Sequence, residues 1–358
     1  MRLTWIMLLM SLWMTSRGQH MAATEARLVQ MSRNILGQTD LEAKKQENRE
    51  FTRLLMETLR RPESYDYPFD SLNTVSILRP ADNSFRLFTW HIADRPDPDA
   101  RYGEENFYYF GLVQRRYITR QGREELIIIP LIEMPAITQG IENMVLDNNN
   151  WLGGQYYPIK NQTTIPAYTF KYADPRNRTA SGEIKRTRQT YYLLLGWNGM
   201  DNTRNMKFVE TMSFDPKDSS RVIFGANVFY FDPNIPKYRA LYTYSEYAPF
   251  TMNFAWVKTG PLTKRRMIVY DHLANPRQSE RKFTEIWEMG PDGSYDALGF
   301  NRWDGSFQWY KNVQLAEKYN SRVNQKALEA QRAEELKKMQ AAGIQVPGIQ
   351  QDKEEPQE

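Results

Sequence analysis

Large apolar residues alternate with small or polar ones through much of the middle of this 358-residue chain. In the stretch 251–258, Met252, Phe254 and Trp256 are large and apolar, whereas the residues between them are not. Because successive side chains of a β-strand point to opposite faces, this pattern places the three residues on one face. We therefore expect Phe254 and Trp256 to pack into a core, and truncation of Trp256 to alanine to cost about 3–5 kcal/mol.

Further stretches rich in aromatic and β-branched residues form two series of predicted strands. In the second series the spacing of about 12 to 18 residues leaves no room for crossover helices. We therefore predict a mainly β fold, an antiparallel meander that is sandwich-like or barrel-like. The predicted strands lie near 74–79, 84–91, 106–117, 124–132, 189–196, 207–214, 221–231, 238–246, 251–258, 265–271, 283–288 and 306–313.

Turn-forming residues mark the breaks between these strands. The string GPDGSYD at 290–296 contains Pro-Asp-Gly, which supplies the φ values that a tight turn requires. Likewise, Asn198-Gly199 after Trp197 indicates a strand that ends in an Asn-Gly turn. The segment 139–162 is predicted to be an elaborated loop with a short helix. We expect a β-rich body over 73–313, with a division into two subdomains near 135–188.

The residues 19–62 have the composition of a helical N-terminal segment, with a predicted break at 37–39. One apolar face is predicted from the helical spacing of Phe51, Leu54, Leu55 and Leu59. The charged residues at 42–50, which include Lys44, are expected to be exposed.

The chain becomes helical again after the body. A helical extension is predicted over 314–345, with an intermittent apolar stripe that includes Leu315. The tail 346–358 is rich in Pro, Gln and Glu and is predicted to be disordered. We expect this C-terminal extension to be a partner-docking arm outside the core.

The amino terminus has the pattern of a signal peptide over 1–18. Arg2 precedes the apolar run LTWIMLLMSLWM, which is shorter than the roughly 20 residues of a spanning helix. Ser16 and Gly18 are small residues before a predicted cleavage at Gln19. A buried helix of the fold is the alternative. A cleaved chain would have no transmembrane segment.

The composition excludes several classes of chemistry. The chain has 0 cysteines, which rules out disulfides, thiolate metal sites and a thiol nucleophile. The net charge of +4 gives no general support for a nucleic-acid partner. No metal site and no cofactor is predicted. The aromatic fraction of 13% stands out, and it favours strands.

Several strings in the body resemble those of a family of uncharacterised exported β-rich proteins of Bacteroidetes. They are FRLFTWHI at 85–92, NFYYFGLVQ at 106–114, YYLLLGWNGMDN at 191–202, VIFGANVFYF at 222–231, MIVYDHL at 267–273 and GPDGSYDALGF at 290–300. The resemblance covers about 85–312. It implies the envelope of a Gram-negative cell and no particular activity.

Few residues are candidates for catalysis, since the chain has only 3 histidines. Asp271 could orient His272 as a general base, or the two could form a structural pair at a strand end. His91 lies near Asp94, Asp97 and Asp99, a cluster that could bind a hard cation or form a solvated loop. A glycosidase would need two carboxylates beside aromatic residues. The carboxylates considered for that role are Glu285, Glu288, Asp292 and Asp296, near Trp287 and Trp303.

Aromatic residues could instead bind a ligand, because Trp and Tyr rings can stack on a sugar or a protein partner. The candidate ligand or partner contacts are Trp151, Tyr156, Tyr157, Trp303 and Trp309, and a place in the core is the alternative for each. A basic cluster could attract an acidic partner or lipid headgroups, or be a solvated loop. Its members are Arg176, Arg178, Lys185, Arg186 and Arg188.

These patterns favour a non-catalytic periplasmic protein that binds or scaffolds another component of the cell envelope, most simply a protein. Its location would be the periplasm, either free or peripheral to the outer membrane. The alternative is a glycan-binding protein or a glycoside hydrolase that uses aromatic platforms and paired carboxylates. A ligand carrier with a barrel-like cavity is a third hypothesis.

Overall fold

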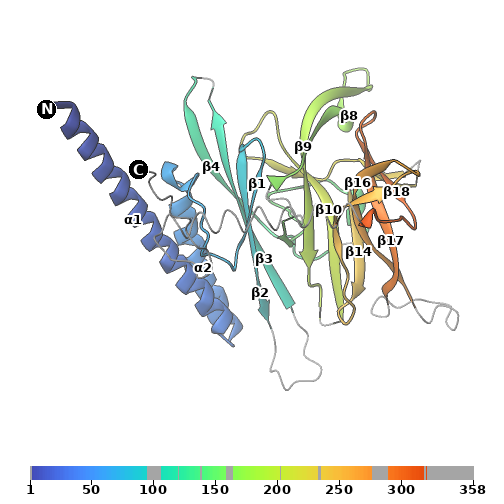
Figure 1. Cartoon of the computed structure of the whole chain (residues 1–358), viewed down its shortest axis with the longest axis horizontal. Coiled ribbons are helices and arrows are strands. Elements are labelled where there is room, and N and C mark those ends of the chain that lie inside the picture. The colour runs from blue at the N-terminus through green and yellow to red at the C-terminus, as the bar shows by residue number, and fades with distance from the viewer. Residues whose placement is uncertain are drawn as a thin grey trace, which may run out of the picture.

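The computed structural model describes residues 2–94, 106–119, 121–137, 139–158, 164–201, 203–232, 235–275, 289–317 and 320. Side chains are described from His20 onward, except at 171–178 and 184–187. The chain is mostly β, with antiparallel sheets that curl like half a barrel and two helices near the N-terminus. Figure 1 shows the helices on one side, followed by three successive groups of strands. The mainly β fold predicted from the sequence is therefore confirmed.

Two helices cover the outer face of the first sheet (Figure 1). Helix α1 (Arg2–Gly37) ends where the break was predicted, and α2 (Leu41–Leu59) begins after Asp40, whose carboxylate caps the Ala43 N–H at 2.7 Å. Among the described residues, no helix is long and apolar enough to cross a membrane. A short 3₁₀ helix, η1 (Pro62–Ser64), follows.

The predicted apolar face of α2 is buried against the first sheet, and Phe51, Leu55 and Leu59 all lie in that core. Lys44 was expected to be exposed, but it is buried, and its ammonium donates to the Ala93 carbonyl at 2.8 Å. The long lysine side chain reaches a strand end, so its charge does not keep it in solvent.

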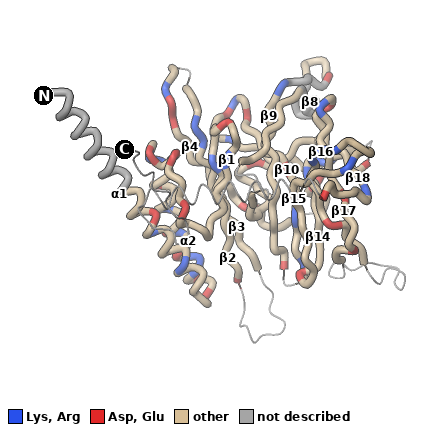
Figure 2. Tube along the Cα trace, in the orientation of Figure 1, with Lys and Arg blue, Asp and Glu red and all other residues tan. Residues whose placement is uncertain are grey.

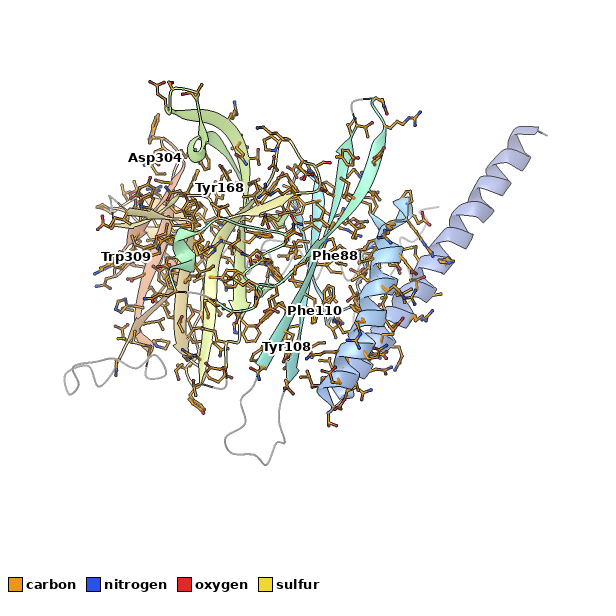
Figure 3. All side chains as sticks on the ribbon, turned by 180° about the vertical axis from the view of Figure 1, so that it is seen from behind. Phe88, Tyr108, Phe110, Tyr168, Asp304 and Trp309 are labelled. Atoms are coloured by element: carbon orange, nitrogen blue, oxygen red, sulfur yellow. The ribbon has the colours of Figure 1, made fainter. Side chains whose placement is uncertain are left out.

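The first sheet has the order β4-β3-β2-β1-β7, and the pairing is antiparallel except between β1 and β7. Its central strand β2 is buried on both faces. Phe85 and Leu87 face the second sheet, whereas Phe88 and Trp90 face the helices. In Figure 3, Phe88 and Phe110 lie on the helix side of this sheet. The strands are β1 (Ser76–Pro80), β2 (Phe85–Asp94), β3 (Asn106–Ile118), β4 (Glu124–Leu131) and β7 (Thr164–Ile165).

The second sheet lies between the other two, and its central strand is β9. Tyr192 and Leu194 belong to the core shared with the first sheet, whereas Tyr191 and Leu193 belong to the core shared with the third. This explains the continuous apolar run YYLLLG, since a strand covered on both faces needs no polar side. The strands are β5 (Leu146–Asp147), β6 (Gln155–Tyr156), β8 (Ala167–Arg178), β9 (Ile184–Asn198), β10 (Arg204–Phe214), β11 (Val222–Phe224) and β14 (Arg239–Ser245), and η2 (Ile141–Asn143) precedes β5.

The third sheet has the order β13-β12-β18-β17-β16-β15, with β12 and β18 parallel. Its inner face packs on the second sheet through residues such as Ile268, Leu298 and Phe307. On the outer face, Val257 and Met267 form a smaller core with the incoming Leu315. The strands are β12 (Phe229–Asp232), β13 (Ile235–Lys237), β15 (Met252–Lys258), β16 (Lys264–Ala274), β17 (Gly290–Asn301) and β18 (Ser306–Tyr310).

Strand β17 corrects a prediction, because its residues 290–296 were assigned to a turn. The register with β16 passes from Asp271 opposite Tyr295 to Leu273 opposite Pro291, so 292–294 bulge out of the ladder. Gly293 has φ +87° there, and the Asp292 carboxylate accepts the Ser294 N–H at 2.9 Å. The turn chemistry is present, but it forms a bulge inside a strand. The strand predicted at 283–288 lies outside the described residues.

Two other expectations about the body are corrected. The basic segment around 176–188 was predicted to be a loop, but β8 and β9 run through most of it as an antiparallel pair. Trp256 was predicted to be buried, but it and Phe254 are only half-buried and line an open groove. Alternation identified their shared face correctly, but that face is only partly covered. The division of the body near 135–188 stays a prediction.

The charged residues Glu210 and Arg239 are fully buried in the second sheet. Arg239 Nε lies 3.1 Å from Glu210 Oε2, and both side chains have 0% exposure. The other oxygen of Glu210 accepts a hydrogen bond from the Tyr156 hydroxyl. Arg239 also donates to the carbonyls of Ile141 and Met144. The buried charges are thus paired and hydrogen-bonded, as burial requires.

Candidate binding groove

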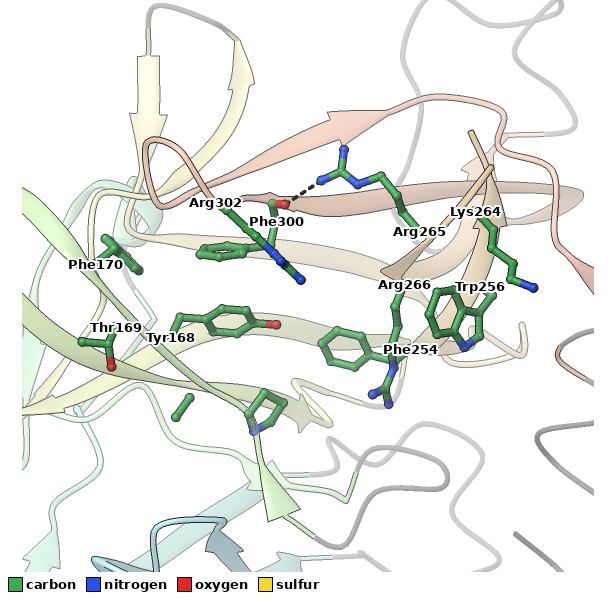
Figure 4. Close-up of a pocket in the computed structure, with 12 residues that line it drawn as sticks. Tyr168, Thr169, Phe170, Phe254, Trp256, Lys264, Arg265, Arg266, Phe300 and Arg302 are labelled. Carbon is green, nitrogen blue, oxygen red and sulfur yellow. Dashed lines mark hydrogen bonds between the residues drawn. The ribbon is translucent and has the colours of Figure 1, made fainter. Parts of the chain in front are cut away.

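An open groove lies where β8 of the second sheet meets the β15–β16 hairpin and the end of β17 (Figure 4). Its volume is about 640 Å³, within the range of roughly 300–1,000 Å³ typical of ligand pockets. It is formed by segments that are far apart in the sequence. Its lining residues are Pro166, Ala167, Tyr168, Thr169, Phe170, Phe254, Trp256, Lys264, Arg265, Arg266, Phe300 and Arg302.

Aromatic rings form much of the groove surface. The rings of Tyr168 and Phe300 lie 4.2 Å apart between centroids, and Phe170 lies 5.9 Å from Phe300. Gly305 makes this packing possible, because a Cβ there would lie 2.2 Å from the Phe170 ring and Gly305 also has φ +74°. Tyr168, Phe170 and Phe300 are each half-buried, so parts of their rings remain accessible.

Four cationic side chains surround these rings, and no Asp or Glu is among the described lining residues. Arg265 donates to the Phe300 carbonyl at 2.6 Å, which ties the hairpin to β17. The Arg266 guanidinium lies 5.1 Å from the centre of the Phe254 ring, a cation–π distance. Lys264, Arg266 and Arg302 are exposed. Figure 2 shows basic residues on this part of the molecule, near β16 and β18.

Burial affects the ionisable groups of the groove. Arg266 is exposed as a residue, but partial desolvation of its guanidinium lowers its pKa, and the nearby Tyr168 hydroxyl opposes this shift. Burial also raises the pKa of Tyr168 to about 12, and the Arg266 charge opposes that shift. The phenol therefore stays neutral and the guanidinium stays charged at neutral pH. The groove presents fixed positive charge beside a hydroxyl that can donate a hydrogen bond.

Local sequence explains why charge and rings meet here. Strands β15 and β16 pair with Trp256 opposite Arg266, so the two residues share a face of the sheet. Phe254 follows on the same face at a spacing of two residues. The run Lys264-Arg265-Arg266 begins β16 directly after the hairpin turn, which places the charges at the rim of the sheet.

The chain segment after the body covers the outer edge of β15. The backbone N–H of Trp256 donates to Asn320 Oδ1 at 2.9 Å. The Trp256 carbonyl accepts from Ala316 N at 2.9 Å and from Asn320 Nδ2 at 3.1 Å. The Lys258 N–H donates to the Gln314 carbonyl at 2.9 Å. The backbone N–H and C=O of Trp256 and the N–H of Lys258 are therefore occupied. Most of the predicted extension 314–345, and all of the tail, lies outside the described residues.

The predicted pair Asp271 and His272 is not brought together. His272 Nδ1 lies 3.1 Å from Asp296 Oδ2 of the neighbouring strand, whereas Asp271 accepts the Thr251 N–H at 2.5 Å. Adjacent residues of a strand point to opposite faces, which explains the separation. Asp296 is 5% exposed and also accepts the Asn312 N–H at 2.9 Å. This geometry fits the structural alternative, a hydrogen-bonded site at a strand bulge.

The five predicted aromatic contacts lie in different places. Trp151 and Tyr156 are fully buried, and the indole N–H of Trp151 donates to the Tyr156 hydroxyl at 2.9 Å, so they are core residues. Tyr157 and Trp309 are half-buried, and Trp309 donates to Asp296 at 3.3 Å. Trp303 is 98% exposed in the turn between β17 and β18. None of the five lines the groove.

Other candidate residues take structural roles or lie outside the described residues. His91 Nδ1 lies 2.8 Å from the Gln155 side-chain oxygen, and its ring packs near Trp197. Among the described residues, no group of His, Asp or Glu could hold a metal ion. The predicted cation loop beyond Asp94 and the carboxylates Glu285 and Glu288 lie outside the described residues, as do the side chains of most of the basic cluster 176–188.

The groove residues are not among the sites predicted from the sequence. Its available signals were the run Lys264-Arg265-Arg266 beside a strand with Phe254 and Trp256, and the aromatic pair Tyr168 and Phe170. No protein-family model, no curated protein and no solved structure matches this chain. The resemblance to exported Bacteroidetes proteins therefore stays a prediction, and the groove carries the functional argument alone.

Proposed function

We propose that this protein is a non-catalytic component of a Gram-negative cell envelope that binds another envelope component through the groove at β8, β15 and β16. The observation that carries the proposal is the combination of partly accessible rings and exposed cations in one open concavity. Aromatic and Arg residues are the types most enriched where proteins bind partners. The signal-peptide pattern over 1–18 supports a periplasmic location.

The groove supports binding better than hydrolysis. A glycosidase needs two carboxylates on either side of the bond that it cleaves. The described lining residues include no Asp or Glu. Asp296, one of the carboxylates considered, is instead occupied by hydrogen bonds from Asn312 and Trp309 and a contact with His272. The aromatic rings of the groove still support the other part of the alternative hypothesis, a glycan-binding protein.

Affinity purification from the native cell envelope tests the proposal. The tagged wild-type protein is compared with the double variant Arg266→Gln/Arg302→Gln and with Arg123→Gln, which changes an exposed cation in the β3–β4 turn. We expect a component that co-purifies with the wild type and with Arg123→Gln but is depleted with the double variant. Equal recovery with all three proteins would show that the groove is not the binding surface.

A further inference from the structure

The charge of the groove specifies the class of its ligand. Building on the proposed function, we infer that the groove binds an acidic glycan, a short oligosaccharide that carries carboxylate or phosphate groups. The rings of Trp256, Phe254 and Tyr168 would pack against sugar faces, and Arg266 and Arg302 would pair with the anionic groups. Planar guanidinium groups match carboxylate and phosphate geometry with two parallel hydrogen bonds.

The arginines are placed for such a ligand. In Figure 4, Arg302, directly after β17, extends toward the Tyr168 hydroxyl, and the Arg266 guanidinium from β16 lies beside the Phe254 ring. Neither arginine forms an ion pair within the described part of the chain. Arg265, in contrast, donates a hydrogen bond to the Phe300 carbonyl and so holds β16 against β17 at the side of the groove. Positive charge that is not matched by nearby carboxylates attracts anions and raises their local concentration.

The covered edge of β15 favours a glycan over an acidic peptide. An extended peptide commonly binds by adding a strand to an exposed sheet edge. Here the N–H and C=O of Trp256 and the N–H of Lys258 are already bonded to residues 314–320. A peptide strand therefore cannot add to β15 at Trp256 and Lys258, and recognition at these residues uses ring faces and charged side chains. A sugar that offers an apolar face and an anionic group fits both features.

The volume also sets the ligand size. About 640 Å³ is suited to a short oligosaccharide and not to a folded domain. The groove is open, so a few sugar units could occupy it while a longer glycan chain continues beyond it. This binding mode predicts that the affinity for the glycan depends both on the arginine charges and on the aromatic rings of the groove.

Isothermal titration calorimetry tests the inference with the full chain. The probes are an oligogalacturonate, the same oligosaccharide with its carboxyl groups methyl-esterified, glucose 6-phosphate, inorganic phosphate, anionic phospholipid vesicles and a poly-glutamate peptide. We expect the oligogalacturonate to bind at least about 10-fold more tightly than its ester, because the ester lacks the charged hydrogen bonds. Binding should weaken as salt is raised, because surface charges are screened.

Variants assign the binding to the groove. Arg266→Gln/Arg302→Gln should weaken oligogalacturonate binding by about 10-fold to 100-fold, and Arg123→Gln should leave it unchanged. Trp256→Phe should retain more affinity than Trp256→Ala, since it keeps a ring face. Each variant is first compared with the wild type by circular dichroism and thermal melting. If an Arg→Gln variant does not fold, Arg266→Lys, which keeps the charge but not the planar fork, replaces it.

The outcomes separate this inference from the proposed function. Equal affinity for the acid and its ester, or tighter binding of poly-glutamate than of any glycan, would overturn the acidic glycan. Tighter binding of inorganic phosphate or of phospholipid vesicles than of glucose 6-phosphate and the oligogalacturonate would also overturn the acidic glycan. If no glycan binds but a groove-dependent envelope component still co-purifies, the ligand class is wrong and the proposed function stands. If recovery does not depend on the groove, both are wrong.

Discussion

Replacing Glu210 with glutamine should destabilise the protein strongly, because it removes the carboxylate that pairs directly with the buried Arg239. Both side chains are fully buried, with Arg239 Nε 3.1 Å from Glu210 Oε2. The carbonyls of Ile141 and Met144 would keep their hydrogen bonds to Arg239. They cannot neutralise its charge, so Glu210→Gln leaves a buried cation without a directly bonded carboxylate.

The expected loss follows from removing one partner of a buried ion pair, which costs about 3–5 kcal/mol. The loss includes a weakened contact with the Tyr156 hydroxyl, which donates to Glu210. This is a large fraction of the roughly 5–15 kcal/mol by which domains are stable. The melting temperature should fall by about 10 °C. Replacing both residues, as Glu210→Leu/Arg239→Met, should recover much of the loss, because no unpaired charge remains.

Urea unfolding followed by circular dichroism measures the effect. The matched control is Glu124→Gln, which removes an exposed partner 2.7 Å from Arg116 and should cost about 0–1 kcal/mol. A loss below about 1 kcal/mol for Glu210→Gln would refute the reasoning, as would a double variant that is less stable than both single variants.

Burial raises the pKa of Glu133 to about 7 from an ordinary value of 4.5. The stability contributed by the protonated Glu133 side chain is therefore complete below pH 4.5 and is lost as the pH rises through 7. Glu133→Gln should flatten that decline in urea titrations, and an unchanged pH profile would contradict it. Trp151→Ala should cost about 3–5 kcal/mol and Trp303→Ala less than about 0.5 kcal/mol in the same assay, because Trp151 is buried and Trp303 exposed. Deletion of residues after 325 should leave the melting temperature within a few degrees while weakening recovery of an envelope partner, whereas failure to fold would make the extension structural. Mass spectrometry of the protein from the cell envelope should give an amino terminus near Gln19, and retention of Met1 would exclude cleavage.

Most strands of the body could be predicted because apolar periodicity reports burial directly. The run YYLLLG was sufficient to place β9, and Phe85 to Ile92 to place β2, since both strands are covered on two faces. The strand β17 was missed because its Pro-Asp-Gly has the composition of a turn. A bulge and a turn need the same backbone conformations, and only the pairing with β16 distinguishes them.

The groove could not be predicted for a different reason. Alternation shows that Phe254 and Trp256 share a face, but it does not show how completely another element covers that face. Tyr168 and Phe300 meet across two sheets, although they are 132 positions apart in the sequence. Residue type alone does not distinguish an aromatic ligand contact from a core residue. Trp151, predicted as a ligand contact, is a core residue for this reason.

The central claim is that the groove binds an envelope component, and the most direct test is recovery from the native cell envelope. Wild-type protein, Arg266→Gln/Arg302→Gln and Arg123→Gln are used as equal amounts of tagged bait at low and high salt. We expect one component to be recovered with the wild type and with Arg123→Gln at low salt, and its recovery to fall by at least about 10-fold with the double variant. Recovery of the same component in equal amount with all three baits would show that the groove does not bind it.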